Sequence, residues 1–209
     1  MFKKTRSLIR LEEYTLLKKL EPVGELLDLG GSTKSGYHEL LPGVVSITTV
    51  NINREYGCDL VFDIQKPFPL ETDTFQTVLA INVLEHIFDF HAVVRETFRV
   101  LKPKGRFVVA VPFMFHIHGS PDDYFRYTES ALRTLMSQYG FININVSFLG
   151  HGLFSLVFQT IGGVFPSFIQ GFFGFFFSKI DSLLCVWKRY RLFAQKIPLG
   201  YFVVAQKPE

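Results

Sequence analysis

The stretch ELLDLGG, residues 25–31, places a carboxylate and two glycines directly after an apolar run. Such a run ending in glycines is typical of a buried strand that enters a tight turn. Similar apolar or β-branched runs follow at residues 44–52, 75–84, 105–113, 141–149 and 199–208. Helical spacing of apolar residues marks residues 7–20, 90–101 and the segment after the capping residue Thr128. This alternation predicts an α/β fold with a mainly parallel sheet covered on both faces.

Length and composition favour one globular domain spanning residues 1–209. The chain has 209 residues, and 48% of them are hydrophobic, which excludes disorder as its main state. Its two cysteines, Cys58 and Cys185, have neither disulfide nor metal-binding spacing. A reducing compartment is therefore expected, and we predict a cytoplasmic protein.

Charge is unevenly distributed along the chain. The net charge of +3 is too small to indicate a nucleic-acid partner. Residues 1–20 and 179–209 each carry six Lys or Arg against two Asp or Glu, so the middle is acidic. The basic ends either contact an anionic surface or form solvated helix faces. The first residues lack the uninterrupted apolar core of a signal peptide.

A Phe-rich segment interrupts the α/β pattern. Residues 149–178 contain nine Phe and no Asp, Glu, Lys or Arg. Pro166 divides the segment into two apolar helices, expected over residues 152–165 and 167–177, each shorter than the ~20 residues of a membrane span. We expect a helical insert over residues 149–196 that dips into one leaflet, covers a pocket or forms an ordinary buried subdomain. Membrane contact is the favoured interpretation, with basic residues and the amphipathic helix within residues 1–22 facing anionic lipids.

Polar residues stand where the predicted strands end. In an open α/β sheet, ligands bind beyond the carboxyl ends of the strands. These side chains are therefore expected to border one cleft: Asp28, Gly30, Asn51, Asp63, Asn82, Glu85 and His86.

These motifs resemble those of the class I S-adenosylmethionine-dependent methyltransferases, in particular the type-11 group. The resemblance runs from about residue 25 to 140 and resumes over residues 197–208. It rests on LLDLGGSTKSG, on CDLVFDIQKPFPLETDTFQTVLAINVLEHI, on VVRETFRVLKPKGRFVVAVPF and on PLGYFVVAQKP. The run from Asp63 through the Leu84-Glu85-His86 tripeptide to Arg106 carries most of its specificity.

The resemblance implies a Rossmann-like three-layer sandwich with a seven-stranded, mostly parallel sheet, an antiparallel last strand and the apolar insert before it. S-adenosylmethionine is the implied cofactor. Asp28 and Gly30 match the positions that hold its methionine end, Asp63 and Ile64 match the adenine-binding pair, and Asn82 lies beside the methyl group. Carboxylates suit the ammonium and the exocyclic amine, and glycine lets the backbone approach closely.

Two positions depart from the family pattern. Ser32 replaces a glycine, so its φ must not be positive. Asn51 replaces the acidic residue that grips the ribose, at a cost of roughly 1 kcal/mol in cofactor affinity. Dinucleotide binding is disfavoured because residues 30–36 do not fit GxGxxG and no acidic residue follows at the usual spacing. A P-loop is excluded because GK[ST] is absent.

A second polar cluster, HIHGSPDDYFRYT at residues 116–128, follows a strand and borders the acceptor side. His118 is the first candidate for a general base and His116 the second, because neutral imidazole can accept a hydroxyl proton near neutral pH. The alternative is an ordinary hydrogen-bonded loop in which Asp123 pairs with Arg126. We predict no metal site, because the sequence shows no third ligand at suitable spacing.

The predicted activity is methyl transfer to an acceptor oxygen, with nitrogen or carbon as less favoured acceptors. The acceptor is expected to be a small molecule, a sugar or a lipid-linked compound, and nucleic acid is not expected. The protein is expected at the inner face of the membrane as a peripheral component. The alternative is a non-catalytic, membrane-associated module that retains the fold, motivated by Ser32 and Asn51. The sequence does not predict an oligomeric state.

Overall fold

The computed structural model describes residues 7–119, 122–150, 152–162 and 167–209. Its strands are β1 (Gly24–Leu29), β2 (Val44–Asn51), β3 (Leu60–Val61), β4 (Phe75–Ile81), β5 (Leu101–Pro112), β6 (Ile142–Leu149) and β7 (Gly200–Gln206). Its α-helices are α1 (Leu8–Leu20), α2 (Phe90–Val100), α3 (Glu129–Gln138), α4 (Leu153–Ile161), α5 (Ser167–Leu184) and α6 (Lys188–Ala194). Short 3-10 helices are η1 (His38–Leu40), η2 (Arg54–Tyr56) and η3 (Leu84–His86).

The strands form one seven-stranded sheet in the order β3-β2-β1-β4-β5-β7-β6. Neighbouring strands are parallel except at β7, which pairs antiparallel with both β5 and β6. The Rossmann-like sheet and its antiparallel last strand are thus confirmed. The order reverses between β1 and β4, and this reversal creates the place where α/β proteins bind ligands.

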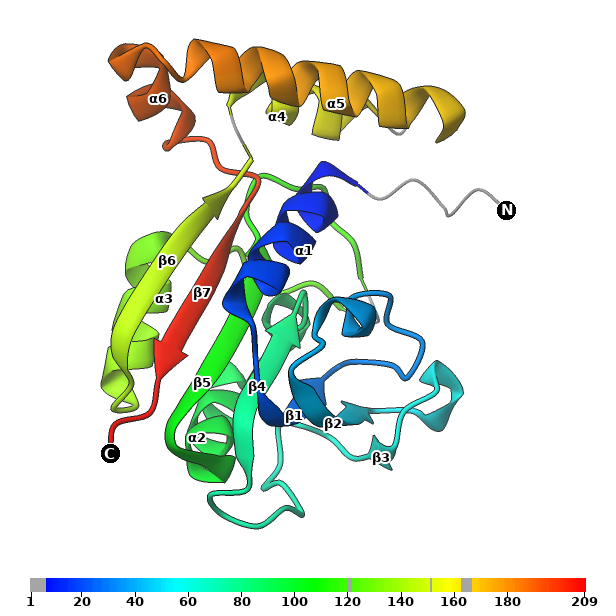
Figure 1. Cartoon of the computed structure of the whole chain (residues 1–209), viewed down its shortest axis with the longest axis vertical. Helices are drawn as coiled ribbons and strands as arrows, with labels where there is room; N and C mark the ends of the chain where they lie inside the picture. Colours follow the sequence, from blue (N-terminus) through cyan, green and yellow to red (C-terminus); the bar gives the residue numbers. More distant parts are fainter. Residues whose placement is uncertain (1–6, 120–121, 151, 163–166) are drawn as a thin grey trace.

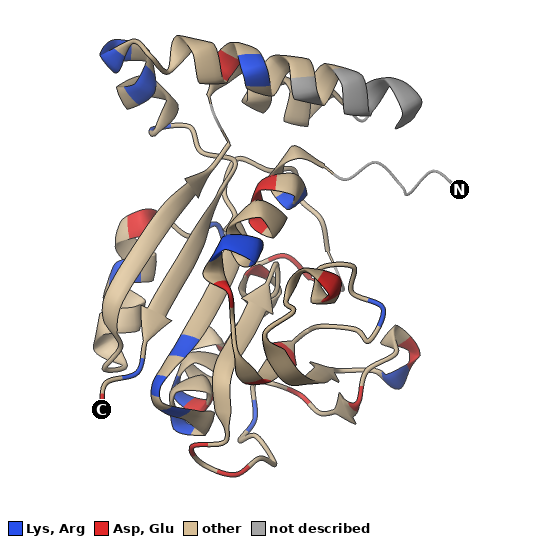
Figure 2. Cartoon of the chain, in the orientation of Figure 1, with Lys and Arg blue, Asp and Glu red and all other residues tan. Residues whose placement is uncertain are grey.

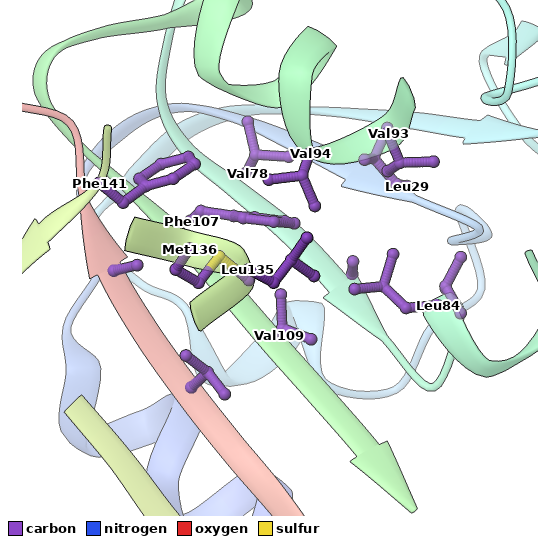
Figure 3. Close-up of a cluster of buried hydrophobic side chains, with 14 of the residues drawn as sticks. Leu29, Val78, Leu84, Val93, Val94, Phe107, Val109, Leu135, Met136 and Phe141 are labelled. Carbon is purple, nitrogen blue, oxygen red and sulfur yellow. The ribbon is translucent and has the colours of Figure 1, made fainter. Parts of the chain in front are cut away.

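Two apolar layers cover the sheet, because successive side chains of a strand point to opposite faces. Leu27 of β1 joins the layer that packs under α2 and α3, around the fully buried Phe107 (Figure 3). Leu26, the preceding residue, joins the opposite layer, where Leu8 and Leu17 of α1 pack. Burying a side chain of this size contributes roughly 1.5–3 kcal/mol, so the two layers hold the strand ends rigidly in place.

Most element boundaries agree with the expected ones, with three differences. β3 has only two residues and pairs through Leu60 with Val50, too short a run to give an alternating pattern. β5 begins at Leu101 instead of residue 105, and Lys104 takes a left-handed φ of 63° there. Helix α5 continues to Leu184 because no Gly or Pro lies between Gly174 and Leu184. Residue 151 and the expected break at residues 163–166 lie outside the described residues.

The insert forms a layer beyond the carboxyl edge of the sheet, with α5 lying across it (Figure 1). Asp181 of α5 is fully buried and joins the layer's helices. Its carboxylate accepts hydrogen bonds from the backbone N–H groups of Phe154 (3.1 Å) and Ser155 (2.6 Å), at the start of α4, and from the Tyr190 hydroxyl of α6. The carboxylate thereby caps α4, since the first N–H groups of a helix lack partners within it.

Within the described residues, none of the helices combines the length and apolarity needed to cross a membrane.

Candidate active site

A cavity of about 430 Å³ opens at the carboxyl edge of the sheet, where the strand order reverses. Five of the six residues predicted to bind the cofactor line it: Gly30, Asn51, Asp63, Ile64 and Asn82. They follow or end four neighbouring strands, β1 to β4, so the sheet alone brings them together. The volume lies in the ~300–1,000 Å³ range of small-molecule sites.

The turn after β1 needs glycines at residues 30 and 31, because neighbouring side chains leave no room for a Cβ. Gly30 has a φ of +70°, and a Cβ there would lie 2.5 Å from the side chain of Val83. A Cβ on Gly31 would lie 2.1 Å from Oδ2 of Asp28. Ser32 is not among the residues with positive φ, as expected, and its hydroxyl donates to the carbonyl of Gly57 (3.2 Å). The serine therefore fits where the family has a glycine.

Asp28 lies beneath this turn and is not among the residues that line the cavity. It is fully buried, and its Oδ2 accepts hydrogen bonds from the Tyr37 hydroxyl and the His38 ring, both at 2.7 Å. Burial raises the pKa of this carboxyl, against the lowering effect of His38 and Tyr37. In this conformation Asp28 holds the segment after the turn, and its predicted contact with the cofactor ammonium stays a prediction.

Asn51 lines the cavity, and its side-chain amide stabilises the glycine turn after β1. Its Nδ2 donates to the carbonyls of Gly30 (3.0 Å) and Gly31 (3.2 Å), and its Oδ1 accepts from the backbone N–H of Ile52 (2.9 Å). An aspartate at this position has no N–H to donate. The departure from the family pattern therefore comes with a local structural role that an acidic residue cannot perform.

Asp63 and Ile64 form one wall of the cavity after β3. The Asp63 carboxylate accepts from the backbone N–H of Gln65 (2.9 Å), which fixes the direction of the side chain. Ile64 is 7% exposed and packs in the core layer beneath α2. A fixed carboxylate beside an aliphatic side chain matches the pair that the resemblance assigns to adenine.

Asn82 connects the end of β4 with the N-terminal helix. Its backbone takes a left-handed φ of 54°, which asparagine tolerates better than most residues. Its Nδ2 donates to Oε1 of the fully buried Glu13 (3.0 Å), and Arg10 of the same helix lines the cavity. Burial raises the pKa of Glu13 to about 7. Neither α1 residue is predicted by the sequence, because helical spacing shows which face is apolar but not which group a polar side chain contacts.

The loop after β5 brings His118 to the same cavity, opposite Glu85 and His86 of η3. Oε1 of Glu85 lies 3.7 Å from Nε2 of His118 and 3.8 Å from Nε2 of His86. The pKa of His118 is raised, chiefly by the nearby Glu85 carboxylate. Glu85 is fully buried, and neither of its side-chain oxygens has a hydrogen-bond partner among the described residues.

An ion pair holds the loop that carries His118. Arg126 contacts both carboxylate oxygens of Asp123, at 2.5 and 2.7 Å, and holds the pKa of that carboxyl well below its usual range. Asp123 also accepts from the backbone N–H of His118 (2.9 Å). The hydrogen-bonded loop foreseen as the ordinary alternative is thus present, and it positions His118.

His116, the second base candidate, lies elsewhere. It borders a separate hollow of about 340 Å³, between residues 113–116 and the α4 residues Leu156, Gln159 and Thr160. Its ring stacks on Phe115 with centroids 4.3 Å apart, and Phe115 in turn contacts the His118 ring edge-on at 5.0 Å. Of the two histidines, only His118 lines the cofactor cavity.

Residues 31–109 match a family model described as a methyltransferase domain, of type 11. This match begins at Gly31, within the glycine turn, and it covers the end of β2, residues 63–64 and η3, which border the cavity or its floor. Over this stretch the chain resembles the class I methyltransferases. This match agrees with the sheet order and the strand-end residues that the sequence predicts for an S-adenosylmethionine-dependent enzyme.

Solved structures of low sequence identity share the fold. An S-adenosylmethionine-dependent methyltransferase from Archaeoglobus fulgidus is 14% identical, with a TM-score of 0.63, covering 98% of this chain and 96% of that one. The [4+2]-cyclase SpnF is 16% identical, with a TM-score of 0.63, covering 99% and 85%.

A phosphoethanolamine N-methyltransferase 2 from Haemonchus contortus, solved with phosphomonomethylethanolamine and S-adenosylhomocysteine, is 16% identical with a TM-score of 0.60. The match covers 95% of this chain, which spans 53% of the Haemonchus chain. No curated protein sequence matches the chain.

Proposed function

We propose that this methyltransferase transfers a methyl group from S-adenosylmethionine to a hydroxyl group of an amphiphilic acceptor. One observation carries the proposal: four strand ends place Gly30, Asn51, Asp63, Ile64 and Asn82 around a single cavity that also contains His118. A cofactor site and a group able to handle an acceptor proton thus share one space.

The cavity fits the cofactor in size and in chemistry. Gly30 leaves room on one side, and the fixed carboxylate of Asp63 supplies an acceptor for an exocyclic amine next to the aliphatic Ile64. When bound, S-adenosylmethionine supplies a methyl group on a positively charged sulfur, a leaving group that needs no further activation. The protein's task is to align the acceptor and to exclude water.

A hydroxyl is favoured over an amine because of what borders the cavity. A hydroxyl is a weak nucleophile unless its proton is removed as the oxygen is methylated, whereas the lone pair of a neutral amine is nucleophilic enough to attack without prior loss of a proton. In the proposed reaction the acceptor oxygen bonds to the methyl carbon, the carbon–sulfur bond breaks, and its electron pair stays on sulfur. The hydroxyl proton is released on the side of the cavity where His118 and Glu85 face each other.

An apolar part of the acceptor has a place next to this site. The hollow between residues 113–116 and α4 adjoins the loop that carries His118, and its walls include Phe113, Met114, Phe115 and Leu156. The Haemonchus enzyme was solved with a small phosphorylated amine, and the shared fold is consistent with a small-molecule acceptor. The apolar walls of the hollow further favour an acceptor with an apolar portion, such as a lipid-linked sugar.

The insert offers a way to meet such an acceptor at a membrane. Leu183, Val186 and Trp187, near the end of α5 and before α6, are 74%, 76% and 69% exposed. Lys188, Arg189 and Arg191 follow directly, and Figure 2 shows the Lys and Arg segments gathered at the α6 end of the layer. Exposed apolar side chains beside basic ones favour peripheral binding to anionic lipid, at the inner face of a membrane.

The proposal is tested by calorimetry with S-adenosylmethionine and S-adenosylhomocysteine. Saturable binding at micromolar to submillimolar concentration supports a working enzyme, and mass spectrometry of extracts incubated with methyl-labelled cofactor then identifies the acceptor.

A second candidate function is a non-catalytic membrane-associated module. One observation favours it: the Asn51 amide donates its hydrogen bonds to the glycine turn. Absence of binding up to millimolar cofactor would favour that alternative.

A further inference from the structure

Three potential metal ligands meet at the acceptor side of the cavity. One ligand atom from each of Glu85, His86 and His118 lies within 4.8 Å of the other two. The first two residues belong to η3 and the third to the loop after β5, so the sequence separates them by more than thirty residues. This separation explains why the sequence showed two histidines but no third ligand.

Both histidines are oriented as metal-binding histidines usually are. Nδ1 of His86 lies 2.5 Å from the backbone carbonyl of Asp122, and Nδ1 of His118 lies 3.2 Å from the backbone carbonyl of His116. A carbonyl oxygen only accepts, so each Nδ1 carries the proton. In the neutral ring, the form that binds a metal, each Nε2 then keeps its lone pair, and both Nε2 atoms face Oε1 of Glu85.

Among the described residues, Glu85 has contacts at ion-pair distance with the two imidazoles but lacks the hydrogen bonds that a buried carboxylate needs. It is fully buried, and neither side-chain oxygen has a hydrogen-bond partner among the described residues. Leaving such a group unpaired is costly, so buried carboxylates are paired or bind metals. The distances of 3.7 and 3.8 Å to the two Nε2 atoms are too long for hydrogen bonds. One ion at ~2.0–2.2 Å from each ligand brings neighbouring donors to roughly 3.4 Å, close to the separation present.

We propose that Glu85, His86 and His118 bind a divalent first-row transition metal, with two imidazole nitrogens and one carboxylate as protein ligands. This donor set suits zinc, cobalt, iron and manganese better than calcium or magnesium. Because His86 and His118 line the cavity, the remaining coordination positions open toward the acceptor.

The use of this metal rests on the proposed function, although the site itself does not. A hydroxyl bound to such an ion has a lowered pKa and releases its proton to solvent. His118 then assists methyl transfer as a ligand instead of taking the proton itself. Asp123, bonded to the His118 backbone and to Arg126, holds that ligand in position.

The test is a titration of the full chain, freed of metal with a chelator, with Co²⁺ followed by its visible absorption and with Zn²⁺ followed by calorimetry. We expect one ion per chain. Glu85→Gln and His118→Ala should each weaken binding at least tenfold. His116→Ala, a change in the same loop outside the cluster, should leave metal affinity unchanged. Thermal unfolding, measured on the same samples, reports whether each variant is folded, and S-adenosylmethionine binding is measured separately.

The outcomes separate the two proposals. If the wild-type chain binds neither ion at submillimolar concentration, or if Glu85→Gln and His118→Ala bind as tightly as wild type, the metal site is wrong. A wild-type chain that binds one metal ion but no S-adenosylmethionine would overturn the proposed function and would support the metal site. Equal losses of metal affinity in His116→Ala and His118→Ala would overturn the metal proposal, because the metal would then not be bound specifically by Glu85, His86 and His118.

Discussion

Glu13 of α1 accepts a hydrogen bond of 3.0 Å from the side chain of Asn82, at the end of β4. The contact joins the N-terminal helix to the residue that the resemblance places beside the reactive methyl group. In the same helix, Glu12 accepts from the backbone N–H of Gly150 (2.6 Å), at the entrance to the insert. Helix α1 therefore contacts both the cofactor cavity and the segment that carries the Phe-rich layer.

Stability should depend on the protonation of Glu13. Burial raises its pKa from 4.5 to about 7, with Arg10 opposing the rise and Glu85 and Glu12 adding to it. The native state thus binds this proton more tightly than the unfolded state. Its stabilising effect is complete below pH ~4.5 and is lost as the pH rises through 7, by up to ~3 kcal/mol. Urea unfolding at pH 5 and pH 8 measures this loss.

Glu13→Gln should remove most of that pH dependence, because the amide does not titrate and can still accept from Asn82. Glu71→Gln, a change at an exposed glutamate, serves as the control and should keep the wild-type pH profile. A Glu13→Gln protein whose unfolding free energy falls between pH 5 and pH 8 as much as that of wild type would disprove this role of Glu13.

Asp63→Ala should weaken S-adenosylmethionine binding tenfold or more, roughly 1.4 kcal/mol. The carboxylate lines the cavity and is held by the Gln65 backbone, so its loss removes a preoriented acceptor. Calorimetry measures the affinity, and Asp59→Ala, at a carboxylate that does not line the cavity, is the comparison. Unchanged affinity in Asp63→Ala would remove this residue from the site.

Restoring the family's acidic residue should not improve cofactor binding. Asn51→Asp gains a charge but loses both hydrogen bonds to the carbonyls of Gly30 and Gly31, and it sets a carboxylate against those oxygens. Each lost bond costs about 1 kcal/mol, which offsets the gain expected from a charged ribose contact. We expect a lower melting temperature and no tighter binding. Tighter binding at unchanged melting temperature would show that the asparagine amide does not matter for the turn.

Membrane binding should depend on the exposed apolar residues before α6. The double variant Leu183→Glu/Val186→Glu changes two side chains that are 74% and 76% exposed, so the fold should tolerate it. In sedimentation with phosphatidylglycerol vesicles, wild type should pellet and the double variant should remain in solution. Val45→Glu, at a residue 83% exposed on β2, is the matched control. Wild-type protein that stays in the supernatant would refute the lipid interpretation.

Local pattern was enough to predict the sheet and most of the cavity wall. Residues such as Gly30, Asp63 and Asn82 stand at strand ends, and parallel strands in one sheet must bring their carboxyl ends to one edge. The short β3 was missed because two residues give no period. The extension of α5 was not predicted because the uncharged, Phe-rich pattern ends before the helix does.

What the sequence alone determined is therefore the order of elements and the residues that follow each strand, since hydrophobic periodicity and turn residues act over a few positions. Only the tertiary structure decided which polar groups meet: Asp28 with Tyr37 and His38, Glu13 with Asn82, and Glu85 with the two histidines. Those pairings depend on how helices and loops pack over the sheet. Packing is set by the fit of whole apolar faces, which no short stretch of sequence contains.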